Sequence, residues 1–136
     1  MMHSESIQVL LIEENPGDAG LISRMLRTAE NPAIEMRHAT SVATGLSVLQ
    51  SGTVDVLLLD LALPGSTGFD TIANAISAAP NIPIIVLTGT DASQTILECI
   101  KAGAKDYFVK SRTDPERLIE VIRRAAKREK RGLSAS

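Results

Sequence analysis

Hydrophobic and polar positions along this chain follow two periods that alternate from one end to the other. Short runs rich in Val, Ile and Leu predict strands at residues 7–12, 33–39, 54–60, 82–88 and 107–110. Between and after these runs, apolar residues recur every three or four positions and predict helices at 16–29, 41–50, 67–79, 91–103 and from 114 onward. Five strands alternating with five helices predict an α/β fold, a doubly wound parallel sheet with helices on both faces.

End signals support several of these helix boundaries. Asn15 can cap the first helix, and Pro16 suits its first turn. Gly52 and Gly103 follow the expected ends of the second and fourth helices, where a glycine is favoured. We therefore expect a regular succession of elements without an internal repeat or linker.

Length and composition bound the class of protein. The chain has 136 residues, which suits one domain spanning 1–136, with a core from about 7 to 128 and short tails. Hydrophobic residues make up 44% and charged residues 22%, as in ordinary globular proteins. The formal net charge of −2 creates no strong field for nucleic acid or for an anionic membrane.

Location and termini give weaker indications. The single cysteine, Cys99, excludes an intrachain disulfide. The N-terminus does not have the pattern of a signal peptide, and no apolar run is long enough to cross a bilayer. We expect a cytoplasmic protein that contacts neither nucleic acid nor membrane directly. The basic end of the last helix favours a solvated face over a nucleic-acid surface, because no aromatic residue accompanies the charges.

Asp60 is the most informative position. It ends the apolar run that starts at Val54, and a charge deep inside such a strand would be costly. It is therefore expected where the strand surfaces, at the carboxyl edge of the sheet, where ligands bind in open α/β folds. Other polar residues follow the expected strands at the same edge: Glu13, Glu14, Thr88, Gly89 and Lys110.

These residue types together predict phosphoryl transfer to a carboxylate. Packed carboxylates repel one another unless a cation joins them, and oxygen ligands suit Mg²⁺. Thr88 and Lys110 can then bind the anionic oxygens while Asp60 attacks phosphorus. Gly89 lets its backbone N–H approach closely.

Four stretches carry a family resemblance, and they cover nearly the whole chain. They are VLLIEENP at 9–16, VLLLDLALPG at 56–65, IIVLTG at 84–89 and AGAKDYFVK at 102–110. In this order they resemble the receiver (response regulator) domain of two-component signal transduction, in its stand-alone form. The resemblance implies a flavodoxin-like three-layer sandwich with strand order 2-1-3-4-5.

The resemblance also implies roles for single residues. Asp60 would accept a phosphoryl group from a histidine kinase or a histidine phosphotransfer protein. Mg²⁺ would be held by Glu14, Asp60 and the backbone carbonyl of Ala62, with Glu13 acting through water. Thr88 and Tyr107 match the switch pair of the family, and the backbone of Ala62 and Gly89 would contact the phosphoryl group.

Two departures from the family pattern are visible, and two further positions bear on dephosphorylation. Glu14 stands where the family usually has Asp, and Ser111 stands where it usually has proline. Ala62 and Thr90 occupy the positions that flank the attacking water, and neither side chain can act as a general base. We therefore hypothesise a passive site, in which water access and Lys110 set the rate of dephosphorylation.

The expected function is that of a self-phosphorylating signalling domain, not a metabolic enzyme. With almost no chain after the last helix, it is expected to act through protein contacts on the face of helix four, strand five and helix five, and a dimer is left open. The exposed residues expected on this face are Lys101, Lys105, Tyr107, Arg112 and Arg117.

Three other classes of function fit the sequence less well. A degenerate receiver, acting as a non-phosphorylated adaptor, is supported by Glu14 and Ser111 but opposed by Asp60, Thr88 and Lys110. A dehalogenase-type phosphatase needs a second Asp where Ala62 stands. A flavodoxin-like electron carrier needs a phosphate loop where Glu13 and Glu14 would repel phosphate.

Overall fold

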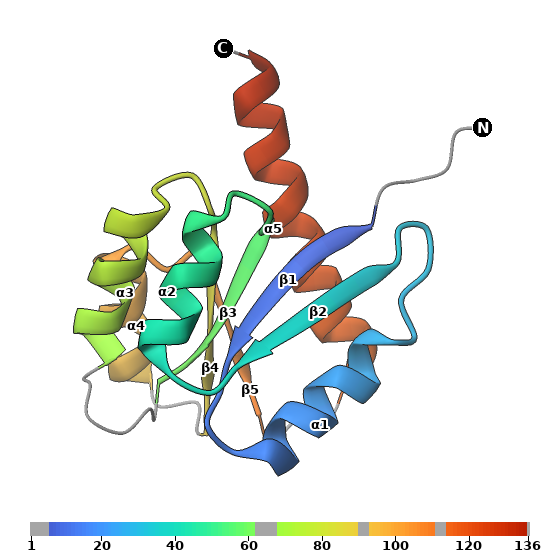
Figure 1. The fold of residues 1–136 in the computed structure, drawn as a ribbon, viewed down its shortest axis with the longest axis horizontal. Coiled ribbons are helices and arrows are strands. Elements are labelled where there is room, and N and C mark those ends of the chain that lie inside the picture. Colours follow the sequence, from blue (N-terminus) through green and yellow to red (C-terminus); the bar gives the residue numbers. More distant parts are fainter. Residues whose placement is uncertain (1–5, 62–67, 90–92, 111–113, 136) are drawn as a thin grey trace.

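A computed structural model describes the backbone of residues 6–61, 68–89, 93–110 and 114–135, with the side chains of the last segment described to residue 126. Its centre is a sheet of five parallel strands in the order β2-β1-β3-β4-β5 (Figure 1). The strands are β1 (Ile7–Ile12), β2 (Ile34–Ala39), β3 (Val56–Asp60), β4 (Ile84–Thr88) and β5 (Asp106–Val109). The predicted α/β fold and strand order are confirmed.

Five helices cover the two faces of this sheet. They are α1 (Pro16–Leu26), α2 (Val42–Gln50), α3 (Gly68–Ala78), α4 (Ser93–Ala102) and α5 (Pro115–Ala135). Helices α1 and α5 pack on one face, and α2, α3 and α4 on the other, which gives three layers (Figure 1). The far end of α5 projects beyond the sheet.

Strands β3 and β4 and helix α1 are shorter than predicted by two or three residues each. The β1–β3 pairing begins with Val9 and Val56, so β3 starts at Val56, although the Asp55 amide already donates to Gln8 O at 2.7 Å. The amide of Ile82 bonds to Ala79 O in a turn, so β4 starts at Ile84. Helix α1 ends at Leu26, and beyond its cap the amides of Thr28 and Ala29 bond only three residues back, to Met25 O and Leu26 O.

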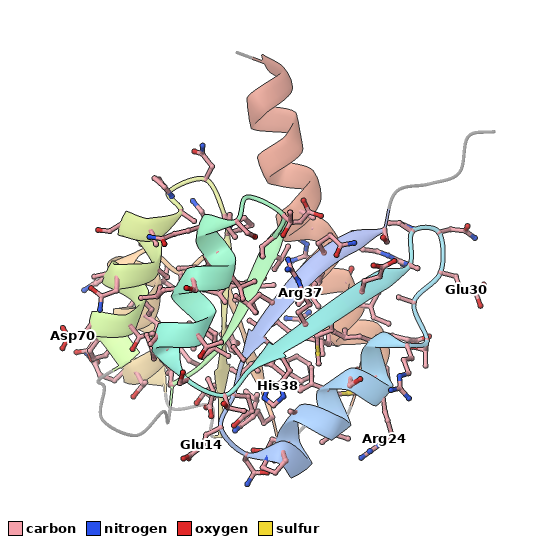
Figure 2. The ribbon with its side chains drawn as sticks, in the orientation of Figure 1. Glu14, Arg24, Glu30, Arg37, His38 and Asp70 are labelled. Atoms are coloured by element: carbon pink, nitrogen blue, oxygen red, sulfur yellow. The ribbon has the colours of Figure 1, made fainter. Side chains whose placement is uncertain are left out.

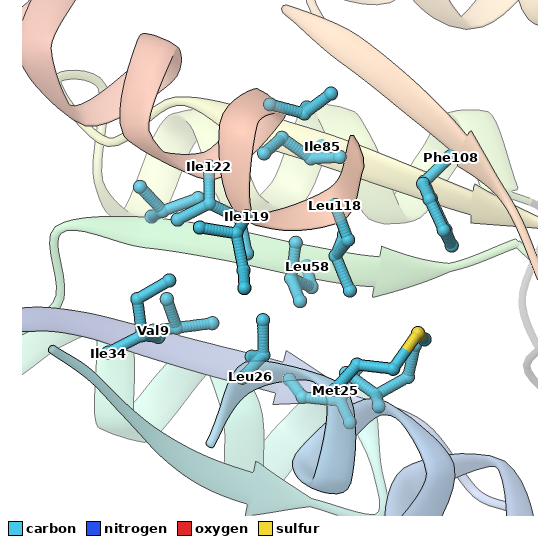
Figure 3. Packing of buried hydrophobic residues seen from close by; sticks show 14 of the residues in the cluster. Val9, Met25, Leu26, Ile34, Leu58, Ile85, Phe108, Leu118, Ile119 and Ile122 are labelled. Carbon is cyan, nitrogen blue, oxygen red and sulfur yellow. The ribbon is translucent and has the colours of Figure 1, made fainter. Parts of the chain in front are cut away.

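Two hydrophobic clusters fill the spaces on either side of the sheet. Between the sheet and helices α1 and α5 lie Val9, Leu26, Leu58, Ile85 and Ile122 with their neighbours (Figure 3). On the opposite face the cluster includes Leu57, Ile72, Val86 and Cys99. Strands β3 and β4 are buried at every position. Their continuous apolar runs therefore reflect a sheet covered on both faces.

Glycines end two helices as expected. Gly52 and Gly103 both have positive φ, 81° and 123°. Their positive φ favours glycine, and at Gly103 a Cβ would also lie 2.3 Å from Ile76 Cδ1, so that side chain would have to move. Among the residues that the structure describes, no helix is both long and apolar enough to cross a membrane.

Candidate functional site

Two carboxylates meet where the strand order reverses. Ile12 pairs with Leu59 across β1 and β3, which places Glu13 and Asp60 side by side at the carboxyl edge. The Glu13 amide donates to Ala39 O at 3.0 Å and so extends the β1–β2 pairing by one residue. Glu13 is 1% exposed and Asp60 is 5% exposed, so two acids lie against the core with little access to water.

Lys110 directly follows β5, a strand at the edge of the sheet, and its ammonium group reaches this pair of carboxylates. Its amide donates to Thr88 O at 2.8 Å, which directs the side chain along the carboxyl edge. Its Nζ lies 2.8 Å from Asp18 Oδ2, 3.2 Å from Glu13 Oε1 and 3.5 Å from Asp60 Oδ1. One ammonium group is therefore shared by three carboxylates from three different elements.

The electrostatics of the cluster follow from this sharing. Burial raises the pKa of Glu13, and hydrogen bonding to Asp60 and the Asp60 charge raise it further. The Asn15 amide, 3.2 Å from Glu13 Oε2, and the Lys110 charge act against this rise. Burial lowers the pKa of Lys110, but the hydrogen bond to Asp18 and the charges of Asp60 and Glu13 outweigh it, so that pKa is raised. The site is short of positive charge.

Other predicted residues lie at or near the same edge. Thr88 is buried at the end of β4, and Gly89 follows it in an exposed bend. A Cβ at Gly89 would meet no atom within 4 Å, so the fold itself does not require glycine there. Tyr107 is half-buried on β5. Glu14 is exposed at the end of β1, in contrast to the buried Glu13 (Figure 2).

Several predictions fall outside the described residues. The backbone carbonyl of Ala62, the position of Thr90, the Lys110–Ser111 peptide bond and the exposure of Arg112 are among them. They stay predictions from the sequence.

The structure adds two residues that sequence reasoning did not assign to the site. Asp18 lies in the first turn of α1, and it also contacts Lys110. His38 is exposed, and its Nε2 donates to the backbone carbonyl of Glu13 at 2.6 Å. Figure 2 shows His38 and Glu14 at this same end of the sheet. The usable signal for Asp18 was its place three residues after Asn15, since α1 starts at the carboxyl edge.

Comparison with known proteins identifies the family of this chain. A family model described as the response regulator receiver domain matches residues 9–123. The chain belongs to this family. An uncharacterized transcriptional regulatory protein of Bacillus subtilis, YxjL, is 31% identical over 131 residues, which cover 94% of this chain and 58% of that protein. The chain spans about three fifths of the length of this protein and of two nitrate/nitrite response regulators that it also matches, at 58% to 59%.

Solved structures share the receiver fold. A CheY-like receiver domain from Methanospirillum hungatei superposes with a TM-score of 0.80 at 20% identity, covering 94% of this chain and 99% of that one. A response regulator from Burkholderia pseudomallei, solved with a phosphorylated aspartic acid and a calcium ion, gives 0.73 at 24% identity, covering 96% and 74%. At these identities the likeness concerns the fold.

The chemistry of the receiver site fits a hard divalent cation. Its charged donors are carboxylate oxygens, and the carboxylates of Glu13, Asp18 and Asp60 all lie within 3.5 Å of the Lys110 ammonium. In the part of the chain that the structure describes, no three His, Cys, Asp or Glu side chains are grouped to hold a metal by themselves. A cation here would therefore rely on few side chains and on backbone or water oxygens, which is how Mg²⁺ is usually bound.

Proposed function

We propose that this receiver is a phosphorylation-dependent signalling switch that accepts a phosphoryl group on Asp60 from a histidine kinase or a histidine phosphotransfer protein. The observation that supports this most strongly is the arrangement at the carboxyl edge. Asp60 ends a fully buried strand beside Glu13, and Lys110 Nζ lies 3.5 Å from its Oδ1. A carboxylate placed in this way is presented for reaction and does not serve the core.

The proposed step is a direct displacement at phosphorus. An oxygen of Asp60 forms the new O–P bond while the P–N bond of the donor phosphohistidine breaks, and the imidazole leaves with the electron pair. Lys110 and the Thr88 hydroxyl bind the phosphoryl oxygens and offset their charge, as the backbone N–H groups of Ala62 and Gly89 would also do. Water later cleaves the acyl phosphate to inorganic phosphate and the free carboxylate.

Mg²⁺ is the proposed cofactor. Glu14, Asp60 and the backbone carbonyl of Ala62 would hold it, with Glu13 acting through water. When bound, the ion supplies positive charge that offsets the carboxylates and the incoming phosphoryl group. The Burkholderia response regulator, whose structure contains both a phosphorylated aspartic acid and a calcium ion, supports the pairing of phosphoryl group and divalent cation.

The output is proposed to be a protein contact on the face formed by α4, β5 and α5. Phosphorylation would draw the Thr88 hydroxyl toward the phosphoryl group and turn Tyr107 inward behind it. Tyr107 and Arg117 help line a hollow of about 400 Å³ on this face, and Lys101 and Lys105 are exposed nearby. Leu97 and Ile100 expose apolar side chains on α4. A protein partner could cover them, and the domain itself carries out no metabolic reaction.

A small-molecule donor tests this function without knowledge of the kinase. The protein is incubated with acetyl phosphate and Mg²⁺, and its intact mass is followed against an Asp60→Asn control. The expected result is one added phosphoryl group on the wild type, none on the variant, and none without Mg²⁺. An unchanged wild-type mass would favour the alternative, a non-phosphorylated adaptor.

A further inference from the structure

The nearest carboxylate to the Lys110 ammonium is not the one that accepts the phosphoryl group. Lys110 Nζ lies 2.8 Å from Asp18 Oδ2 but 3.5 Å from Asp60 Oδ1. The shorter of these two contacts is a hydrogen bond, and the longer one is an ion pair. In this state the ammonium is bound more closely by the helix than by the strand that carries Asp60.

Asp18 is held where it can do this. Its amide donates to Asn15 Oδ1 at 2.9 Å, so the cap of α1 fixes the first helical turn at the carboxyl edge. The Asp18 side chain is 42% exposed, whereas Asp60 is 5% exposed. Lys110 Nζ also hydrogen-bonds to the buried Glu13 Oε1 at 3.2 Å, so the ammonium is held by two acids other than the phosphoacceptor, and Asp18 is the one at the rim of the site.

We propose that Asp18 is a positioning residue that competes with the phosphoacceptor for Lys110 and so limits how readily the site takes up a phosphoryl group. The inference rests on the proposed function, because Lys110 must leave Asp18 before its ammonium can bind the oxygens of a phosphoryl group on Asp60. Asp18 acts through Lys110 and touches no reacting atom.

Removing the Asp18 charge tests the competition. In Asp18→Asn the rate of phosphorylation by acetyl phosphate should rise about two- to fivefold, the size expected for loss of a half-exposed ion pair. The affinity for beryllium trifluoride, an inorganic mimic of the bound phosphoryl group, should rise by a similar factor. Asp18→Glu, which restores the carboxylate, should return both values toward wild type.

Two controls separate the ion pair from a general change in charge. Glu116→Gln also removes one acid from a first helical turn, that of α5, and Glu116 is not among the described partners of Lys110. This variant should leave both values unchanged. In a Lys110→Gln background, Asp18→Asn should no longer affect beryllium trifluoride affinity, because the group through which Asp18 acts is gone.

The results of these experiments separate a failure of the Asp18 proposal from a failure of the proposed phosphoacceptor function. If the wild type takes up no phosphoryl group, the proposed function fails and the competition fails with it. If the wild type is phosphorylated but Asp18→Asn is unchanged or slower, Asp18 does not restrain Lys110 and only this inference falls. An equal gain in Glu116→Gln, or a gain that persists without Lys110, would also overturn it.

Discussion

Two aspartates at opposite ends of one strand have very different surroundings. Asp55 immediately precedes β3, and its Oδ2 accepts the Gln8 amide at 2.8 Å, while its own amide donates to Gln8 O at 2.7 Å. Asp60 ends β3, and it shares the Lys110 ammonium with Glu13 and Asp18. Asp55 ties β3 to β1 at the amino edge, whereas Asp60 lies in a group of acids at the carboxyl edge.

The contrast separates an acid that serves the fold from one that serves chemistry. A carboxylate bonded to a backbone amide has its charge satisfied by the structure itself. A carboxylate packed against another carboxylate lowers the stability of the fold unless a cation offsets the repulsion. Such a cost is typical of residues that are kept for function. The same residue type thus acquires its role from the edge of the sheet at which it stands.

The largest expected effect comes from removing the cation of the carboxyl edge. Lys110→Met should slow phosphorylation by acetyl phosphate by about a hundredfold, because a positioned donor to the reacting oxygens is lost. Arg24→Met, which removes an exposed cation near the end of α1, should leave the rate unchanged. The rate of mass gain measures both. Similar rates for the two variants would mean that Lys110 plays no part in the reaction.

The next largest effect is the stabilisation by Mg²⁺, which should depend on Asp60 at the carboxyl edge and not on Asp55 at the amino edge. Mg²⁺ at about one hundred times its dissociation constant should raise the free energy of unfolding by about 2.7 kcal/mol. Asp60→Asn should lose most of this gain, and Asp55→Asn should retain it. Urea denaturation with Mg²⁺ or with a chelator measures the difference. Equal gains in both variants would place the ion elsewhere.

Without metal, the free energy of unfolding should respond differently to substitution of the two aspartates. Asp55→Asn should cost about 1 kcal/mol, because a charge-assisted hydrogen bond to the Gln8 amide becomes a neutral one. Asp60→Asn should be neutral or stabilising, since it relieves repulsion with Glu13. Thermal and urea unfolding in the presence of a chelator measure both. A larger loss for Asp60→Asn would show that Asp60 also serves the fold.

The smallest expected effect is a dependence of stability on pH that comes from Glu13. Because the pKa of Glu13 is raised by burial and by Asp60, its contribution to stability is complete below its ordinary value of 4.5 and is lost as the pH rises through the raised value. Wild type should therefore lose stability relative to Glu13→Gln as the pH rises from 4.5. Urea midpoints across this range measure the slope, and parallel curves would contradict the raised pKa.

Much of the fold could be predicted from the spacing of apolar residues, because that spacing reflects which positions are buried. Strand β1 has the predicted bounds, and its residues are mostly buried. The predicted starts of β3 and β4 were early for the same reason. Val54 is buried and Ile82 is half-buried, yet neither belongs to the strand ladder. Apolar residues that lead into a strand look like the strand itself.

The site was predictable as far as strand ends determine it. The carboxyl ends of parallel strands share one edge, so the meeting of Glu13, Asp60 and Lys110 follows from the order of the strands. The contact between Asp18 and Lys110 does not follow in this way, because it depends on how close α1 approaches β5 and on side-chain conformation. The same holds for His38, whose contact with the backbone of Glu13 has no sequence pattern.

The central claim is that Asp60, and not another acid of the cluster, captures the phosphoryl group. After incubation with acetyl phosphate and Mg²⁺, borohydride reduces an aspartyl phosphate to homoserine, and peptide mass mapping locates the product. The account predicts homoserine at position 60 and unmodified acids at positions 13, 14, 18 and 55. Homoserine at position 55, reduction products at positions 13, 14 or 18, or no product at all, would contradict it.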